Sequence, residues 1–261
     1  MKILFLGDVV GRRVRRLLRR EVRRLRTENG VDFVVANGEN ASGGRGIDPD
    51  ALEEMLDSGI DVLTSGNHIW QHRSLLPHLD REARLLRPHN FAEGSPGHGW
   101  TVVEATNGVR VGVLNLIGRV FMGSYDCPFR AADRVLEEGA SRADVVLVDM
   151  HAEATSEKVG MGWYLDGRVA AVVGTHTHVQ TADERVLPEG TAHLSDLGMC
   201  GPMDSVIGMR RREVLERFLT QRPARFEVAK GPLLLQGAFI EVDPKGGRAL
   251  SIRRLREVHE P

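Results

Sequence analysis

The segment RVAAVVGTHTHVQTAD, residues 168–183, joins an apolar run of β type to two histidines that one threonine separates. A short run of alanine and valine that ends in glycine is typical of a strand buried within a parallel sheet. His176 and His178 follow this strand at its C-terminal end, which is where ligands bind in open α/β sheets. Two histidines alone do not decide between metal ligands and hydrogen-bonded residues at a strand end. The decision depends on what else the chain delivers there.

Short apolar runs alternate with helical patterns along most of the chain. This alternation predicts an α/β fold with a buried, largely parallel sheet. No linker, repeat or change in composition divides the sequence, so we expect residues 1–261 to form one domain. Two pairs of runs flank turn sequences and predict antiparallel hairpins, namely 100–105 with 109–116 and 233–242 with 249–255. The other strands are expected at residues 2–6, 33–36, 62–64, 145–148 and 169–173, and the helices near residues 12–28, 49–58, 130–139 and 209–221.

The composition is that of an ordinary globular protein. The chain has 261 residues, of which 41% are hydrophobic and 27% charged, and its formal net charge is −1. These values give no overall electrostatic signature of a nucleic-acid or membrane binder. The two cysteines, Cys127 and Cys200, fit neither a disulfide framework nor a zinc ribbon. The N-terminal run MKILFLGD is too short for a signal peptide, and no run approaches transmembrane length. We therefore expect a cytoplasmic protein with no membrane partner.

The helix expected near residues 12–28 is unusually basic. It contains nine arginines between Arg12 and Arg26, together with an apolar stripe at helical spacing. We favour a core-facing helix with a solvated arginine face, because the chain uses arginine rather than lysine as its general cation. The alternative is a surface that contacts RNA, anionic lipid or a partner helix. Association of the chain with copies of itself stays open.

Five apolar runs are followed by residues that can bind a cation. Each residue alone has an ordinary explanation, such as a turn, a helix cap or a buried hydrogen bond, but five coincidences are harder to explain than one. Carboxylates, amides and imidazoles massed in one crevice would be desolvated and poorly paired without a cation. These donors suit iron, manganese or zinc, and the absence of thiolate argues against a structural zinc site. In chain order the residues are Asp8, Asn37, Glu39, Asn40, Asn67, His68, Asp149, His151, His176 and His178.

Two ions roughly 3.5 to 4 Å apart commonly act together in phosphatases and nucleases. Such a pair needs a carboxylate that bridges it, and Glu39 is the best candidate. If the segment after residue 175 stays extended, His176 and His178 point the same way, because side chains two residues apart share a face. The expected division of ligands is Asp8, Glu39, Asn40 and His178 on one ion and Glu39, Asn67, His151 and His176 on the other.

The motifs Gly-Asp, Asn-Gly-Glu-Asn, Gly-Asn-His, a lone His and Thr-His-Thr-His occur in this order, followed by DLGMCGPMDSVIG at 196–208. This ordered set resembles the calcineurin-like metallophosphoesterases, and within them the bacterial branch of dimetal 2′,3′-cyclic-nucleotide phosphodiesterases. The resemblance implies an α/β fold in which a β-sandwich is flanked by helices, with the active site at the C-terminal ends of the strands. It also implies two metal ions, iron and/or manganese. The metal ligands that it implies are Asp8, Glu39, Asn40, Asn67, His151, His176 and His178.

The sequence departs from the usual pattern of that superfamily at three points. The first motif, Asp-x-His, is replaced by Asp8-Val9-Val10, so one histidine ligand is missing. Glu39 stands in place of the usual bridging aspartate, and Ile69 stands where an acid commonly follows Gly-Asn-His. These changes match the cyclic-phosphodiesterase branch better than the protein phosphatases. They suggest that Asn40 fills the gap at the first ion.

The expected function is hydrolysis of 2′,3′-cyclic nucleotides, and of other small phosphodiesters, by attack of a metal-bound hydroxide. His68 follows the ligand Asn67 directly and is suited to act as the general acid. The resemblance supplies the cyclic substrate, whereas the residues alone support only phosphoester hydrolysis. The alternatives are a phosphomonoesterase or nucleotidase on the same site, and a regulatory RNA-binding scaffold that retains a metal site.

Three further features have two interpretations each. Residues 43–46, Gly-Gly-Arg-Gly, either wrap a phosphate with backbone amides or form a flexible loop. The segment 121–129 is either a lid over the base of a ligand or a loop packed on the sheet. His193 and Asp196 either approach the site or have a plain structural role, and we favour the structural role.

Overall fold

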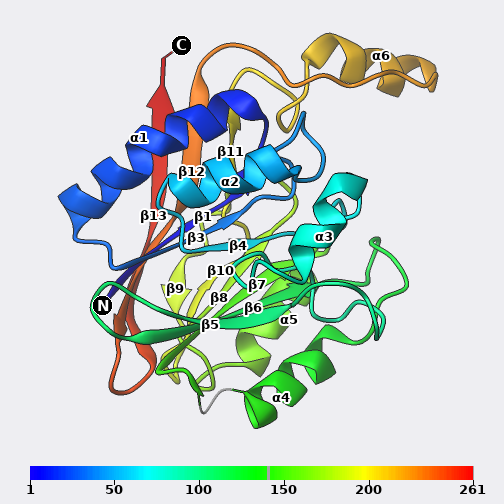
Figure 1. Ribbon diagram of the computed structural model, residues 1–261. Coiled ribbons are helices and arrows are strands. Elements are labelled where there is room, and N and C mark those ends of the chain that lie inside the picture. Colours follow the sequence, from blue (N-terminus) through cyan, green and yellow to red (C-terminus); the bar gives the residue numbers. More distant parts are fainter. Residues whose placement is uncertain (140–141, 261) are drawn as a thin grey trace.

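Two β-sheets pack against each other in the computed structural model, which describes residues 1–139 and 142–260 (Figure 1). The first sheet has the strand order β2 (Asp8–Val9), β11 (Met199–Pro202), β12 (Leu233–Asp243), β1 (Lys2–Leu6), β3 (Phe33–Asn37) and β4 (Val62–Thr64), and β13 (Arg248–His259) also pairs with β12. The second sheet has the order β5 (Trp100–Glu104), β6 (Arg110–Ile117), β7 (Val145–His151), β8 (Ala171–Thr175), β10 (Ala192–Leu194) and β9 (Arg185–Val186).

Helices cover the outer faces of this sandwich. On the first sheet lie α1 (Arg12–Asn29) and α2 (Pro49–Asp57), and on the second lie α4 (Pro128–Glu138) and α5 (Thr155–Tyr164) (Figure 1). A short 3₁₀ turn (Arg73–Leu75) leads into α3 (Leu76–Leu79), and α6 (Arg211–Thr220) stands off the body of the molecule. Within the described ranges, no helix is both long enough and apolar enough to cross a lipid bilayer.

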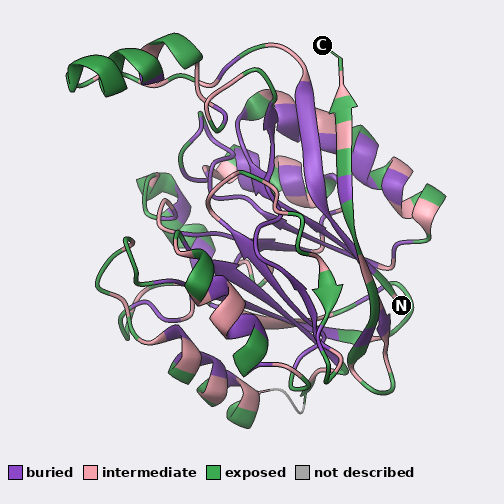
Figure 2. Cartoon of the chain, turned by 180° about the vertical axis from the view of Figure 1, so that it is seen from behind, coloured by how far each residue is buried: buried purple, intermediate pink, exposed green. Residues whose placement is uncertain are grey.

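The central strands are apolar at successive positions because each sheet is buried on both faces. In β1, Ile3 and Phe5 point into the core between the two sheets, whereas Leu4 and Leu6 point into the core beneath α1 and α2. Side chains of a strand alternate between its faces, so a strand covered on both sides has to be apolar at every position. Figure 2 shows this burial throughout the central strands. The continuous apolar runs in the sequence follow directly from this packing of two sheets between two layers of helices.

The expectation of one largely parallel sheet is wrong, whereas the expected sandwich flanked by helices is confirmed. Parallel pairing joins β1, β3 and β4 in one sheet and β6, β7, β8 and β10 in the other. Antiparallel pairing occurs through β12 and at the edges β5 and β9. An apolar run looks the same in either sheet, so alternation of elements along the sequence could not separate the two. Both predicted hairpins, β5 with β6 and β12 with β13, are confirmed.

The basic helix α1 is anchored by its apolar stripe. Val14, Leu18, Val22 and Leu25 are buried in the core of the first sheet. Several arginines on the same helix are paired with acidic residues, and Arg24 alone contacts Glu21, Glu28 and Glu257. The interpretation of α1 as a core-facing helix is confirmed.

We expect Leu18→Ala to lower the free energy of unfolding by about 2 to 5 kcal/mol, because it leaves a cavity where Leu18 is fully buried. Urea denaturation followed by circular dichroism measures this change. Leu250→Ala is the matched control, since Leu250 is 67% exposed, and it should change stability by less than about 0.5 kcal/mol. Equal effects of the two substitutions would contradict the core position of α1.

Candidate metal centre

The C-terminal ends of strands from both sheets meet at one place. β3 and β4 end in register, with Asn37 opposite Thr64, and their following loops carry Glu39 and Asn67. β7 and β8 also end in register, with His151 opposite Thr175. Parallel pairing therefore aligns the loops that carry the predicted ligands at one edge of each sheet.

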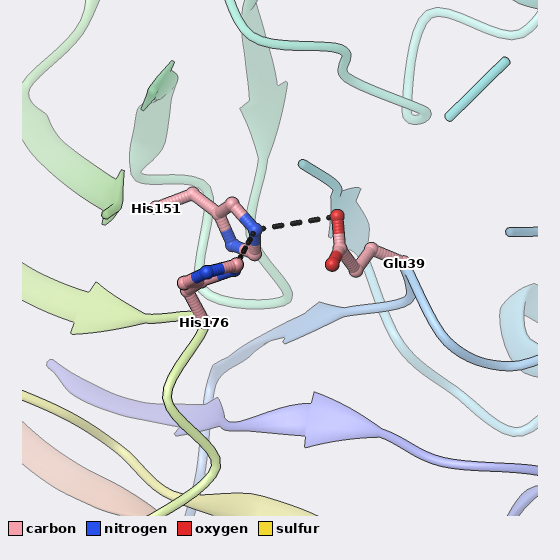
Figure 3. Close-up of side chains that lie close together, drawn as sticks. All are labelled: Glu39, His151 and His176. Carbon is pink, nitrogen blue, oxygen red and sulfur yellow. Dashed lines mark hydrogen bonds and ion pairs between the residues drawn. The ribbon is translucent and has the colours of Figure 1, made fainter. Parts of the chain in front are cut away.

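Glu39 lies at the centre of this cluster and is almost completely buried. Its Oε2 is 3.2 Å from His151 Nε2 (Figure 3), and its Oε1 is 3.0 Å from His68 Nδ1. The backbone N–H of His68 also donates to Oε2, at 3.2 Å. The carboxylate thus touches side chains from both sheets, as the predicted bridging role requires.

His151 is the meeting point on the side of the second sheet. Its Nε2 lies 3.1 Å from His176 Nδ1 and 3.3 Å from Asn67 Oδ1. Figure 3 shows the two imidazoles and Glu39 facing one another. One nitrogen or oxygen atom from each of these three residues lies within 4.8 Å of the others, which is compact enough for a shared cation.

A buried chain of hydrogen bonds behind His151 orients its ring. His151 Nδ1 lies 2.9 Å from Thr175 Oγ1, and the Thr175 hydroxyl donates to Asp149 Oδ1 at 2.7 Å. Asp149 also accepts from Thr64 and Asn37. Metal-binding histidines usually donate their second ring nitrogen to such a partner, which fixes the tautomer. The role of Thr175 escaped sequence analysis because a threonine at a strand end carries no distinctive spacing.

The other half of the cluster contains Asp8, Asn40 and His178. Asp8 Oδ2 accepts from the His176 backbone N–H at 3.0 Å, and its Oδ1 lies 3.8 Å from His178 Nε2. Asn40 lies between two imidazoles, with Nδ2 at 3.0 Å from His178 and Oδ1 at 2.9 Å from His68. All eight residues predicted for the site are therefore brought together.

The segment that holds His176 and His178 is not extended. The two histidines have φ values of 100° and 65°, in the left-handed region that residues other than glycine rarely adopt. The expectation of an extended segment, in which the two side chains point the same way, is therefore wrong. The turned backbone sends His176 towards His151 and His178 towards Asp8 and Asn40.

Buried residues beneath this turn hold it in place. Asp196 Oδ2 accepts from the Thr177 hydroxyl at 2.7 Å and from Lys158 Nζ at 2.6 Å. Asp196 thus lies next to the site and has a structural role there, because it holds the turn that carries His176 and His178. His193 is buried on β10, where its Nδ1 lies 3.1 Å from the Val172 carbonyl oxygen, so its role is structural. Lys158 was missed because α5 has only a weak apolar pattern.

The pKa values of the cluster reflect buried negative charge. Burial raises the pKa of Asp8 to about 6, although His178 and His151 oppose the rise. Burial acts in the same direction on Glu39, but His151 and His68 outweigh it and hold its pKa well below the usual value. For His151 burial lowers the pKa, yet Glu39 and Asp8 outweigh this and raise it to about 9. Glu39 and Asp8 therefore favour a positive charge next to His151 Nε2.

A metal ion fits this requirement. Asp8 Oδ1 is buried without a hydrogen-bond partner in the described part of the chain, and burying a carboxylate oxygen unpaired is costly. Burial and the neighbouring His151 lower the pKa of His176 to about 3, so its imidazole is a neutral ligand at pH 7. The donor set of carboxylate, amide and imidazole suits iron, manganese or zinc.

A cavity of about 530 Å³ opens beside the cluster. Glu39, Asn40, His68, His176 and His178 line one part of it, and residues 43–45 line another. A further wall comes from residues between 206 and 226, which are apolar apart from Arg217. Residues 121–129 are not among the lining residues, and Tyr125 of this segment packs on Phe91 with ring centroids 5.2 Å apart. The segment therefore packs on its neighbours in this structure, and its role as a lid over the ligand stays a prediction.

The comparisons with known proteins agree with this geometry. A family model described as "YmdB-like protein" matches residues 4–255. A 2′,3′-cyclic-nucleotide 2′-phosphodiesterase from Bacillus subtilis (strain 168) is 46% identical, over 98% of this chain and 96% of that protein. A hypothetical protein from Thermus thermophilus has a similar crystal structure, with a TM-score of 0.93, 40% identity and coverage of 99% of this chain and 100% of that one. A crystal structure described as a novel phosphatase, from Mycoplasma pneumoniae, also has a TM-score of 0.93, with 32% identity and coverage of 100% and 94%.

We expect Glu39→Gln to abolish or weaken binding of both ions together, because one carboxylate would serve both. Elemental analysis of protein purified without oxygen measures the metal content. Glu104→Gln is the control, since Glu104 is exposed at the end of β5, and it should keep the wild-type content. Two metal equivalents in Glu39→Gln would show that Glu39 is not the bridge.

We also expect Thr175→Val to weaken metal binding about 10- to 100-fold, the usual effect of losing a partner that orients a ligand. The substitution breaks the link from His151 to Asp149. Titration of the metal-free protein with Mn²⁺ measures the affinity. Thr175→Ser keeps the hydroxyl and should retain most of it. If valine and serine have the same effect, the hydroxyl does not orient His151.

Proposed function

The chain belongs to the YmdB-like proteins, a family of calcineurin-like metallophosphoesterases, and from this premise we propose that it hydrolyses 2′,3′-cyclic nucleotides with the help of two metal ions. The relative from Bacillus subtilis that is 46% identical over nearly the whole chain carries that activity in its name. The observation that carries the proposal is the convergence on Glu39 of polar ligands from both sheets, beside a buried and unpaired oxygen of Asp8.

The contacts suggest how the ligands divide. Asp8, Asn40 and His178 would hold one ion, whereas Asn67, His151 and His176 would hold the other, and Glu39 would serve both. Bound there, the pair of ions would supply Lewis-acid chemistry, since it acidifies water and neutralises charge on the phosphoryl oxygens. Iron and/or manganese suit this donor set, which lacks thiolate.

His68 is suited to protonate the leaving group. Its side chain is about one quarter exposed and lines the cavity. Its Nδ1 is held by Glu39 and Asn40, at 3.0 and 2.9 Å, whereas its Nε2 has no hydrogen-bond partner within residues 1–139 and 142–260. As water oxygen forms a bond with phosphorus, the bond from phosphorus to a ribose oxygen breaks. His68 gives that oxygen its proton, so a ring-opened nucleotide is released.

The cavity can also bind the charge of the substrate. Arg45 lies on the glycine loop 43–46 and lines the cavity, as does the wall from residues between 206 and 226. Gly44 has a φ of 90°, and an added Cβ there would come within 2.5 Å of the Met209 side chain. Glycine is therefore needed for this loop to approach the wall. The close approach brings an arginine to the rim of the cavity.

A panel of phosphoesters tests the proposal. The metal-loaded protein should hydrolyse 2′,3′-cyclic AMP faster than 3′-AMP or 5′-AMP. Faster release of phosphate from the open nucleotides would instead favour a phosphomonoesterase or nucleotidase on the same site. Bound metal without turnover of any ester would favour a regulatory scaffold. Contact of α1 with RNA, association of copies and a cytoplasmic location stay predictions.

We expect His68→Ala to keep both metals and to slow hydrolysis of 2′,3′-cyclic AMP by roughly 10² to 10⁴, the usual contribution of a positioned acid. The loss should be much smaller on bis(p-nitrophenyl) phosphate, whose leaving group needs little protonation. His78→Ala is the matched control, because His78 is exposed on α3. Equal losses on both substrates would show that His68 does not act as the acid, and loss of metal would make it a ligand.

A further inference from the structure

The segment 203–232 is longer than the topology requires. It connects β11 to β12, and these neighbouring strands pair antiparallel, with Gly201 opposite Leu234 and Pro202 opposite Leu233. Such strands need only a short turn between them. The chain instead makes a long excursion that carries α6, and the Met203 N–H donates to the Pro232 carbonyl at its base, at 2.9 Å. Long connections of this kind in compact domains are usually functional.

This excursion is fixed to the metal centre. The carbonyl oxygen of Ile207 lies 2.9 Å from His178 Nδ1. Ile207 has a φ of 46°, an unusual value for a β-branched residue, and the surrounding backbone is held by bridges of Met209 with Val206 and Val228. The position of the excursion relative to the ligand His178 is therefore set by the fold.

The face that the excursion turns to the cavity is apolar and aromatic. Phe218 from α6 and Phe226 from the returning chain line the cavity, together with Ile207 and Met209. Phe218 is 70% exposed, and Figure 2 shows α6 as largely exposed and apart from the body. Val214 is the one residue of α6 that is buried. The cavity thus joins a charged end, at Glu39 and the histidines, to an aromatic end.

We propose that this aromatic end, formed by Phe218 and Phe226, is the subsite for the nucleobase of the substrate. The inference rests on the proposed function. A 2′,3′-cyclic nucleotide matches the two ends of the cavity. Its negative charge lies on the phosphate, and its base is planar and uncharged. The cavity volume of about 530 Å³ lies in the range of pockets that enclose small ligands, roughly 300 to 1,000 Å³.

The ring of Phe226 already accepts a planar group. The guanidinium of Arg217 lies over it, with Cζ 5.4 Å from the ring centroid. Bases and arginine stack on aromatic rings in the same manner. No side-chain amide or carboxylate occurs among the residues of this wall that line the cavity between 206 and 226. Recognition would then depend on stacking, which accepts every base, and the base would take the place of the Arg217 guanidinium on Phe226 or stack on the other side of the ring.

Steady-state kinetics of the metal-loaded protein test the subsite with two substrates. One is 2′,3′-cyclic AMP, and the other is methyl ribofuranoside 2,3-cyclic phosphate, which has the reactive ring and no base. The wild type should have a KM about tenfold or more lower for the nucleotide. Phe226→Ala and Phe218→Ala should each raise that KM about tenfold, leave kcat within about twofold, and leave hydrolysis of the baseless substrate unchanged.

Two control substitutions test where the base binds. Leu219→Ala lies on the same helix, at a residue that is 85% exposed and does not line the cavity, and it should change neither substrate. Phe121→Ala removes an exposed phenylalanine from the segment 121–129 and should also have no effect. If Phe121→Ala raises KM for the nucleotide and Phe226→Ala does not, the base binds elsewhere and the proposal is overturned. Equal effects of Phe226→Ala on both substrates would overturn it too.

Failure of the proposed function and failure of the base subsite give different results. If the wild type hydrolyses neither cyclic phosphate, the proposed function fails, and calorimetric binding of adenosine to the metal-loaded protein then tests the wall directly. Phe226→Ala should weaken that binding about tenfold, and absent binding or an unchanged affinity would overturn the subsite. Phe226→Leu keeps an apolar side chain without a ring, so it should show the same loss if Phe226→Ala fails to fold.

Discussion

Negative charge buried between the two sheets is the constraint on which this structure depends. Asp8, Glu39 and Asp149 are all buried, and ionised carboxylates in such a setting are costly unless a cation or several donors balance them. The fold balances Asp149 with donors from Thr64, Thr175 and Asn37. It leaves Asp8 and Glu39 facing imidazoles. The difference separates Asp149, which is fully paired, from the two carboxylates that we propose as metal ligands.

The two-sheet architecture is what brings these carboxylates together. Asp8 and Glu39 belong to the first sheet, whereas His151 and His176 belong to the second. A single sheet would place the ends of β3 and β7 along one line, with other strands between them. In two stacked sheets those ends come together, so that Glu39 after β3 contacts His151 at the end of β7. The candidate metal centre is therefore located where the two sheets meet, and the excursion 203–232 lines the cavity beside it.

Much of this arrangement could be predicted from sequence, because strand ends and ligand types are local features. The eight site residues each follow an apolar run, and all of them lie together. The number of sheets could not be predicted, since an apolar strand is compatible with either layer. The supporting pair of Lys158 and Asp196 was not recognisable as a pair, because its two members are 38 positions apart and belong to unrelated elements. Phe218 and Phe226 were not recognised as residues that line the cavity, because exposed phenylalanines carry no periodic signal.

The pairing of β1 with β12 links the first strand of the chain to one near its end, with Lys2 opposite Glu241. β2, which contains Asp8, pairs with β11, and β11 is held by β12. Contacts between residues so distant in sequence form slowly, because a large loop has to close before they stabilise anything. A nascent chain on the ribosome therefore contains every metal ligand before it can place Asp8. For the proposed metal centre, loading with both ions would therefore have to follow completion of the chain.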